Sequence, residues 1–180
     1  MSKRFSCRTS AVLWGILCLI MPVHATQIRD DLGETLSFSS HPMRIISLAP
    51  SNTEMLFALG VENRVVGVTE YCNYPPKAES IENVADFNTV NLEKVVQAKP
   101  DLVLAIRGND MESLRSLRQL GIPVFSLDVQ NLDQVSSALR RLGMLLGVEQ
   151  HANALADSLA SRVRLVQRER AATIEKPRVM

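Results

Sequence analysis

The sequence predicts an α/β protein in which helices flank a parallel β-sheet. Short apolar segments alternate with segments of helical periodicity, and this alternation is typical of parallel sheets. The clearest junction spans residues 44–60, RIISLAPSNTEMLFALG, where an apolar run passes through Pro50 into a helix. Internal repeats and low-complexity segments are absent from the sequence. Together these observations predict one α/β lobe of ordinary size.

The first 25 residues predict an export signal. Three basic residues precede an apolar run over residues 11–21, and the sequence VHA at positions 23–25 matches what a signal peptidase reads. We therefore expect cleavage after Ala25 and a mature chain located in the periplasm. The apolar run is short for a membrane-spanning helix, and an uncleaved anchor is the alternative.

Removal of this signal changes the composition of the chain. The remaining 155 residues suit one domain and carry 17 basic and 19 acidic residues, a formal net charge of −2. This charge argues against a nucleic-acid partner. Cys72 is the single cysteine left, so no intramolecular disulfide can form. Its thiol is either a packing group or a group that ligates or oxidises.

The elements of the mature chain follow in order. Residues 28–38 have the pattern of a hairpin that turns at Asp31-Leu32-Gly33. Short apolar segments predict parallel strands over residues 43–49, 64–68, 101–106 and 123–127. Helices are predicted over residues 51–59, 91–98, 110–120 and from Asn131 to Gly147.

The helix after Pro50 opens with polar groups. Ser51 and Glu54 have the spacing of a capping box, in which the hydroxyl and the carboxylate bond to backbone amides of the first turn. A helix start at the carboxyl edge of a sheet also offers free N–H groups, and the Ser51, Asn52 and Thr53 side chains, to a ligand. The residues alone leave open whether Ser51 only caps the helix or also contacts a ligand.

A long final helix is predicted from Glu149 to about residue 172. Its apolar positions form one stripe, and at 1.5 Å per residue it would extend roughly 35 Å. Four arginines near its end complement the helix dipole as a solvated face, and a basic interaction patch is the alternative. Pro177 follows, and residues 178–180 read like the opening of a strand.

Five segments in this order carry a resemblance: DDLGETLSF, RIISLAPSNTEMLFALG, GVTEYCNYPP, NLEKVVQAKPDLVLAIRGN and LRQLGIPVF. They resemble the cobalamin and iron-siderophore family of periplasmic ABC-transporter binding proteins, over about residues 28–180. The resemblance implies a Rossmann-like lobe at residues 26–148 and a connecting helix at 149–176, after the signal peptide at 1–25. Residues 177–180 would begin a truncated second lobe.

The resemblance is strongest to the vitamin B12 receptors, whose Tyr-x-x-Tyr-Pro-Pro element matches residues 71–76. In those receptors the ligand lies between two lobes. The resemblance implies that the loop at Pro50, Ser51 and Asn52 contacts the ligand, together with Tyr71, whose ring face suits a flat macrocycle. From the residues alone, Tyr71 and Tyr74 could simply anchor a loop.

Two further cleft positions are implied by the resemblance. Phe87 stands where the B12 receptors carry a tryptophan, so the aromatic surface is kept and the indole donor is lost. Arg107 and Gly108 follow the third parallel strand, where the resemblance places another cleft loop. Pairing of Arg107 with Asp110 is the alternative role for that side chain.

Glu93 has a separate implied role. Leu92, Val95 and Val96 are expected to face the core, which leaves Glu93 on the outer side of its helix. From the residues alone, Glu93 is interpreted as a solvated carboxylate. In the family an exposed glutamate of each lobe meets arginines of the membrane permease, and Glu93 matches the first of them; such charges orient docking.

Enzymatic motifs are absent from the sequence. It contains no Gly-x-Ser-x-Gly, Gly-x-Gly-x-x-Gly or Gly-x-x-x-x-Gly-Lys motif, and the mature chain has only His41 and His151, so neither a catalytic centre nor a metal site is expected. The resemblance implies a solute-binding component of an ABC importer that captures a corrinoid, vitamin B12, and needs no cofactor. The alternatives are an iron-siderophore or haem receptor of the same family and, from another class, a secreted α/β hydrolase. A truncated receptor and a natural single-lobe decoy protein also remain as alternatives.

Overall fold

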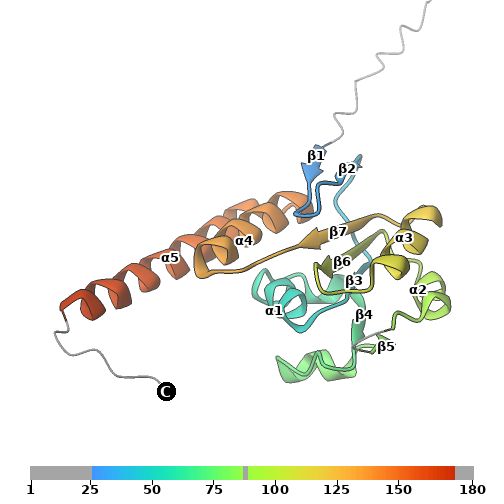
Figure 1. The fold of residues 1–180 in the computed structure, drawn as a ribbon, viewed down its shortest axis with the longest axis horizontal. Coiled ribbons are helices and arrows are strands. Elements are labelled where there is room, and N and C mark those ends of the chain that lie inside the picture. Colours follow the sequence, from blue (N-terminus) through green and yellow to red (C-terminus); the bar gives the residue numbers. More distant parts are fainter. Residues whose placement is uncertain (1–25, 87–88, 173–180) are drawn as a thin grey trace, which may run out of the picture.

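The computed structural model describes residues 26–86 and 89–172, which form two β-sheets and five α-helices (Figure 1). The strands are β1 (Thr26–Arg29), β2 (Thr35–Phe38), β3 (Ile45–Ser47), β4 (Val65–Thr69), β5 (Asn83–Ala85), β6 (Leu102–Ile106) and β7 (Val124–Leu127). The helices are α1 (Pro50–Ala58), α2 (Leu92–Ala98), α3 (Met111–Gln119), α4 (Leu132–Leu146) and α5 (Glu149–Ala172). Two short 3-10 helices, η1 (Glu62–Arg64) and η2 (Pro76–Ser80), flank β4.

The main sheet has the strand order β5-β4-β3-β6-β7, and every pair in it is parallel. This confirms the predicted α/β class. Strand β5 was not predicted, because its three residues follow a polar stretch and contain only two apolar side chains. The chain leaves β3 toward β4 on one side and returns to β6 on the other, so the order of the sheet reverses at β3. In open α/β sheets a ligand crevice forms at such a reversal, beyond the carboxyl ends of the strands.

Helices cover both faces of this sheet. Leu56 of α1 and Leu142 of α4 pack in one cluster of buried side chains, which α5 joins through Ala152. Val95 of α2 and Leu114 of α3 belong to a second cluster on the opposite face. The central strands are buried on both sides, as their continuous apolar sequences predict.

The predicted hairpin is confirmed as β1 and β2, which pair antiparallel with Ile28 opposite Leu36. Ile28 is buried in the same cluster as α4 and α5. The hairpin therefore lies against α4 rather than extending the main sheet (Figure 1).

Helix α5 packs along α4 and then continues beyond the lobe (Figure 1). In its outer part Leu165 is 57% and Val166 is 63% exposed, because no other described element covers them. Within the described ranges, none of the helices combines the length and apolar character needed to cross a membrane. The predicted extension of the helix to residue 176 and the strand opening at 178–180 lie outside the described residues.

Two local expectations are wrong. Helix α1 begins at Pro50 with Ala49 as its N-cap and without a side-chain capping bond, so Ser51 and Glu54 form no capping box. Proline is pre-organised for the first helical position, and this draws the helix start one residue earlier and places Ser51 inside it. On α2, Val96 is 47% exposed, whereas it was expected to face the core.

Candidate functional site

Two cavities lie at the carboxyl edge of the main sheet, on either side of the loop that follows β6. The smaller, of about 360 Å³, is bounded by the loops after β3 and β4 and includes Pro50 and Tyr71. The larger, of about 830 Å³, lies between α1, α4 and α5 and has a mostly apolar lining. Ile106 and Gly108 line both cavities. The site is therefore a divided hollow whose central ridge is the end of β6.

The first turn of α1 is positioned by buried polar contacts. Ser51 is exposed and lines the larger cavity, and Pro50 lines the smaller one. Asn52 is fully buried, and its Nδ2 donates a hydrogen bond to the carbonyl of Ala105 at 3.1 Å. Thr53 Oγ1, also buried, lies 2.8 Å from Ser47 Oγ. Asn52 thus ties α1 to β6 and also lines the larger cavity beside Ser51, while Pro50 lines the smaller one.

Tyr71 is 51% exposed and lines the smaller cavity. A side-chain hydrogen bond with Glu70, together with the negative charges of Glu70 and Asp86, raises the pKa of the Tyr71 phenol above its ordinary value. The next residue is anchored, because Cys72 is 3% exposed and its Sγ lies 3.1 Å from the Thr53 hydroxyl.

The Cys72 thiol is therefore a buried packing group. It also lies 3.2 Å from the hydroxyl of Thr69, the last residue of β4. These contacts fasten the loop that carries Tyr71 to α1 and β4. Tyr71 consequently stands on a fixed base, with its ring at the mouth of the smaller cavity.

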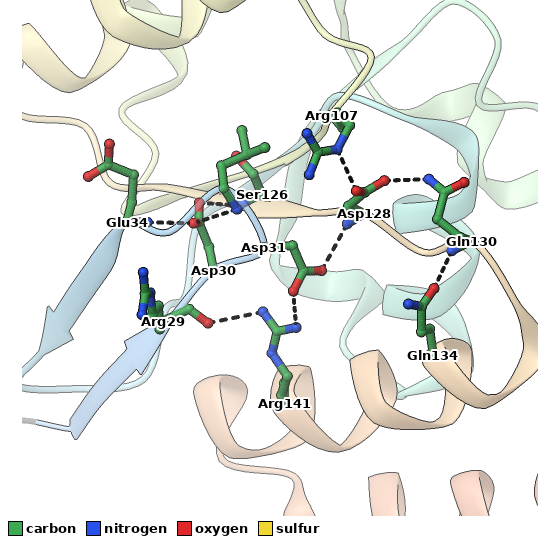
Figure 2. Close-up of polar contacts among 11 residues, drawn as sticks. Arg29, Asp30, Asp31, Glu34, Arg107, Ser126, Asp128, Gln130, Gln134 and Arg141 are labelled. Atoms are coloured by element: carbon green, nitrogen blue, oxygen red, sulfur yellow. Dashed lines mark hydrogen bonds and ion pairs between the residues drawn. The ribbon is translucent and has the colours of Figure 1, made fainter.

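Arg107 pairs with Asp128, and not with Asp110 as the sequence alternative held (Figure 2). The reason is that Asp110 caps α3, where its carboxylate accepts hydrogen bonds from the amides of Glu112 and Ser113. Asp128 lies immediately after β7, the neighbour of β6 in the sheet. The Arg107 guanidinium, and a hydrogen bond from Gln130, hold the pKa of the Asp128 carboxyl below its ordinary value.

The β1–β2 hairpin fixes this end of β7 (Figure 2). Asp30 Oδ2 accepts a hydrogen bond from the Ser126 amide at 3.1 Å, and Asp31 Oδ2 accepts one from the Asp128 amide at 2.8 Å. Asp31 also pairs with Arg141 of α4. Sequence reasoning missed Asp30, Asp31 and Asp128, although the position of Asp128 directly after a predicted strand was a signal for it.

The remaining expected positions lie elsewhere. Glu93 is exposed in the first turn of α2 and lines neither cavity. Phe87 lies outside the described residues. Over residues 26–86 and 89–172, no three histidine, cysteine or acidic side chains gather closely enough to hold a metal ion. Within the described residues, the site is an apolar hollow with two exposed aromatic rings, Tyr71 in the smaller cavity and Tyr74 in the larger one, and with the Arg107–Asp128 ion pair.

Residues 45–180 match the family described as periplasmic binding protein. The chain belongs to this family. Its members function as substrate-binding proteins outside the cytoplasm, in keeping with the predicted export signal; cleavage after Ala25 stays a prediction, because residues 1–25 lie outside the described part. The expected family is thereby confirmed.

Among curated relatives, the chain is 37% identical over 158 residues to an uncharacterized ABC transporter substrate-binding lipoprotein, YvrC, of Bacillus subtilis, covering 86% of this chain and 50% of that protein. It is 35% identical over 142 residues to the vitamin B12-binding protein of Photorhabdus laumondii, covering 78% of this chain and 52% of the relative. The chain thus spans about half the length of the curated relatives it matches.

Solved structures agree with the fold. The periplasmic vitamin B12 binding protein BtuF of Vibrio cholerae superposes with a TM-score of 0.69 at 34% identity, over 73% of this chain and 52% of the other. A periplasmic heme binding protein of Pseudomonas aeruginosa gives a TM-score of 0.65 at 29% identity, over 68% and 45%. The described part of the chain therefore has the architecture of one lobe of such proteins.

Proposed function

We propose that this chain contributes one wall of the ligand site of a solute-binding protein that serves an ABC importer, and that its ligand is a corrinoid such as vitamin B12. The observation that carries the proposal is the exposed Tyr71 ring beside an apolar hollow at the sheet's carboxyl edge. A broad planar macrocycle is held best by apolar surface and aromatic faces. The similarity to vitamin B12-binding proteins supports the same ligand class.

Within this proposal Pro50, Ser51 and Gly108 supply close backbone and side-chain surface to the ligand, and Arg107 supplies a polar rim. Asn52 contacts the ligand with them in this proposal, since it lines the larger cavity, where its buried side chain is held by the bond to β6. Phe87 keeps its proposed place as a second aromatic wall on the strength of the family resemblance alone.

The proposed activity is binding without chemistry, and no resident cofactor is required. The described lining of the cavities contains no histidine, so the serines in it, Ser51 and Ser158, lack the usual base that activates a hydrolase nucleophile. A haem or iron-siderophore ligand is the second candidate, because a heme binding protein shares the fold at 29% identity.

Glu93 is the proposed contact to the membrane permease. Its carboxylate stands exposed on the first turn of α2 and away from both cavities, so a partner could reach it without displacing a ligand. A complementary arginine on the permease would steer docking more than it would add affinity. Glu93→Gln should therefore slow uptake while leaving ligand binding to the purified protein unchanged.

The test is calorimetric titration of the chain with cyanocobalamin. The chain is expressed with its own N-terminal segment, recovered from the periplasm and checked for folding by circular dichroism. We expect saturable binding that Tyr71→Ala weakens about tenfold and Tyr71→Phe largely retains, since the ring face supplies the contact. Intact mass of the recovered protein checks cleavage after Ala25. The absence of saturable binding by a folded, monomeric chain would contradict a corrinoid site built from these cavities.

A further inference from the structure

The charged side chains of the two cavities nearly cancel. The described lining contains two cations, Arg107 and Arg162, against three carboxylates, those of Glu54, Asp86 and Asp128. Arg107 Nε donates to Asp128 Oδ2, so its charge is already compensated. A ligand carrying several negative charges therefore meets no surplus of positive charge in this lining.

Asp128 is held in place through both its backbone and its side chain. Its amide donates to Asp31 Oδ2 at 2.8 Å, and Asp31 in turn pairs with Arg141 of α4 (Figure 2). The Asp128 carboxylate is 17% exposed and accepts from both Arg107 and Gln130, whereas the Arg107 side chain is 61% exposed. The carboxylate is thus a fixed group, and the guanidinium that projects over the hollow is bound to it.

We propose that Asp128 is a specificity-determining residue. By neutralising the charge of Arg107, it makes the hollow bind an uncharged macrocycle in preference to a macrocycle that carries several carboxylates. This inference rests on the proposed function, because an uncharged corrinoid is the ligand proposed there. Cyanocobalamin has no net charge and bears peripheral amides, whereas coproporphyrin is a macrocycle of similar breadth with four carboxylates.

The consequence is a change in selectivity when Asp128 loses its charge. Asp128→Asn keeps the size of the side chain and the backbone N–H bond to Asp31, and it leaves Arg107 with an uncompensated charge. Because the guanidinium is largely exposed, solvent screens most of its attraction for an anion. We expect the ratio of the coproporphyrin Kd to the cyanocobalamin Kd to fall about three- to tenfold in low salt, and less at high ionic strength.

The experiment compares the full chain with three variants, using metal-free coproporphyrin in fluorescence titrations and cyanocobalamin in calorimetry. Glu79→Gln is the matched control, since it removes one negative charge from an exposed residue outside both cavity linings. It should leave the Kd ratio unchanged. The double variant Arg107→Gln/Asp128→Asn should return the ratio to its original value, because the freed cation is gone.

Three results would overturn the inference: a ratio in Asp128→Asn equal to that in Glu79→Gln, a lowered ratio that persists in the double variant, or no porphyrin binding by any variant. Failure of the proposed function is seen separately, as absence of cyanocobalamin binding by the unmodified chain. In that case the coproporphyrin Kd alone, compared between Asp128→Asn and Glu79→Gln, still decides the role of Asp128.

Discussion

The contact between α4 and α5 yields a quantitative stability prediction. Gly143 of α4 and Ala152 of α5 are both buried where the two helices meet. A Cβ atom on Gly143 would lie 2.2 Å from the Cβ of Ala152 and 3.4 Å from the Cα of Glu149. Since carbon atoms pack at about 3.5–4.0 Å, the helices would have to separate by about 1.5 Å.

The expected cost of Gly143→Ala follows from two opposing terms. Overpacking of a buried contact costs about 1–3 kcal/mol, and the upper end applies here because the obstructing atom is a Cβ fixed to a helix backbone. Alanine in a helix interior is favoured over glycine by about 1 kcal/mol. The free energy of unfolding should therefore fall by about 2 kcal/mol, and Tm by about 4–8 °C for a domain of this size.

Urea unfolding followed by circular dichroism measures this change. Ala152→Gly is the matched partner, because it removes the atom that a new side chain on Gly143 would strike. In a double-mutant cycle the combination Gly143→Ala/Ala152→Gly should be more stable than the sum of the single effects by at least 1 kcal/mol. A Gly143→Ala variant as stable as the original chain, or strictly additive effects, would refute the steric reasoning.

Three further predictions concern buried and titrating groups. Asp30→Asn should lower the free energy of unfolding in urea by about 2–3 kcal/mol, because the Asp30 side chain is fully buried and accepts three backbone N–H bonds; a loss below about 0.5 kcal/mol would contradict this. Hydrogen bonds from the first turn of α3 lower the pKa of the Asp110 carboxyl, so its stabilisation is complete above the unfolded pKa of about 3.9 and is lost as the pH falls through the lower folded pKa. Asp110→Ala should accordingly lower the urea midpoint at pH 7, with a difference from the original chain that shrinks in acid. In a Tyr74→Phe background the phenolate absorbance of Tyr71 should appear above pH ~10, and Glu70→Gln should bring its pKa down; an unchanged titration curve would rule out Glu70 as the cause.

The elements that sequence could predict are those with strong local signals. The side chains of Asn91, Asp110 and Asn131 cap the starts of their helices. Gly121 and Gly147 follow α3 and α4 with positive φ. Each of these helix boundaries is therefore determined by a single residue that can be recognised in the sequence. Helix α5 is helical from Glu149 through Ala172, the last described residue, as the spacing of its apolar stripe predicts. Strand β5 has no such local signal, and its residues form a strand because they pair with β4.

The site could be predicted only in part, because some of its contacts depend on strand order rather than on nearby sequence. The family resemblance implied that the loops after β3 and β6 face the same cleft, and the structure places Pro50 and Gly108 in the lining of one cavity. The partner of Arg107 was not predictable in this way. Asp110 is three residues away and is used as a cap, whereas Asp128 is brought close by the pairing of Ile106 with Leu127.

The polar contacts at the end of β7 have two separate roles. Some hold the position of the backbone, and others determine the charge of the hollow. Asp30 and Asp31 bond to backbone amides of β7 and of the residue that follows it, and these bonds do not depend on which side chain stands at position 128. The carboxylate of Asp128 instead compensates Arg107. A substitution at position 128 can therefore change the electrostatics of the hollow while the hairpin keeps its walls in place. By the same reasoning, a substitution at Asp30 should lower stability and disturb ligands of every charge alike.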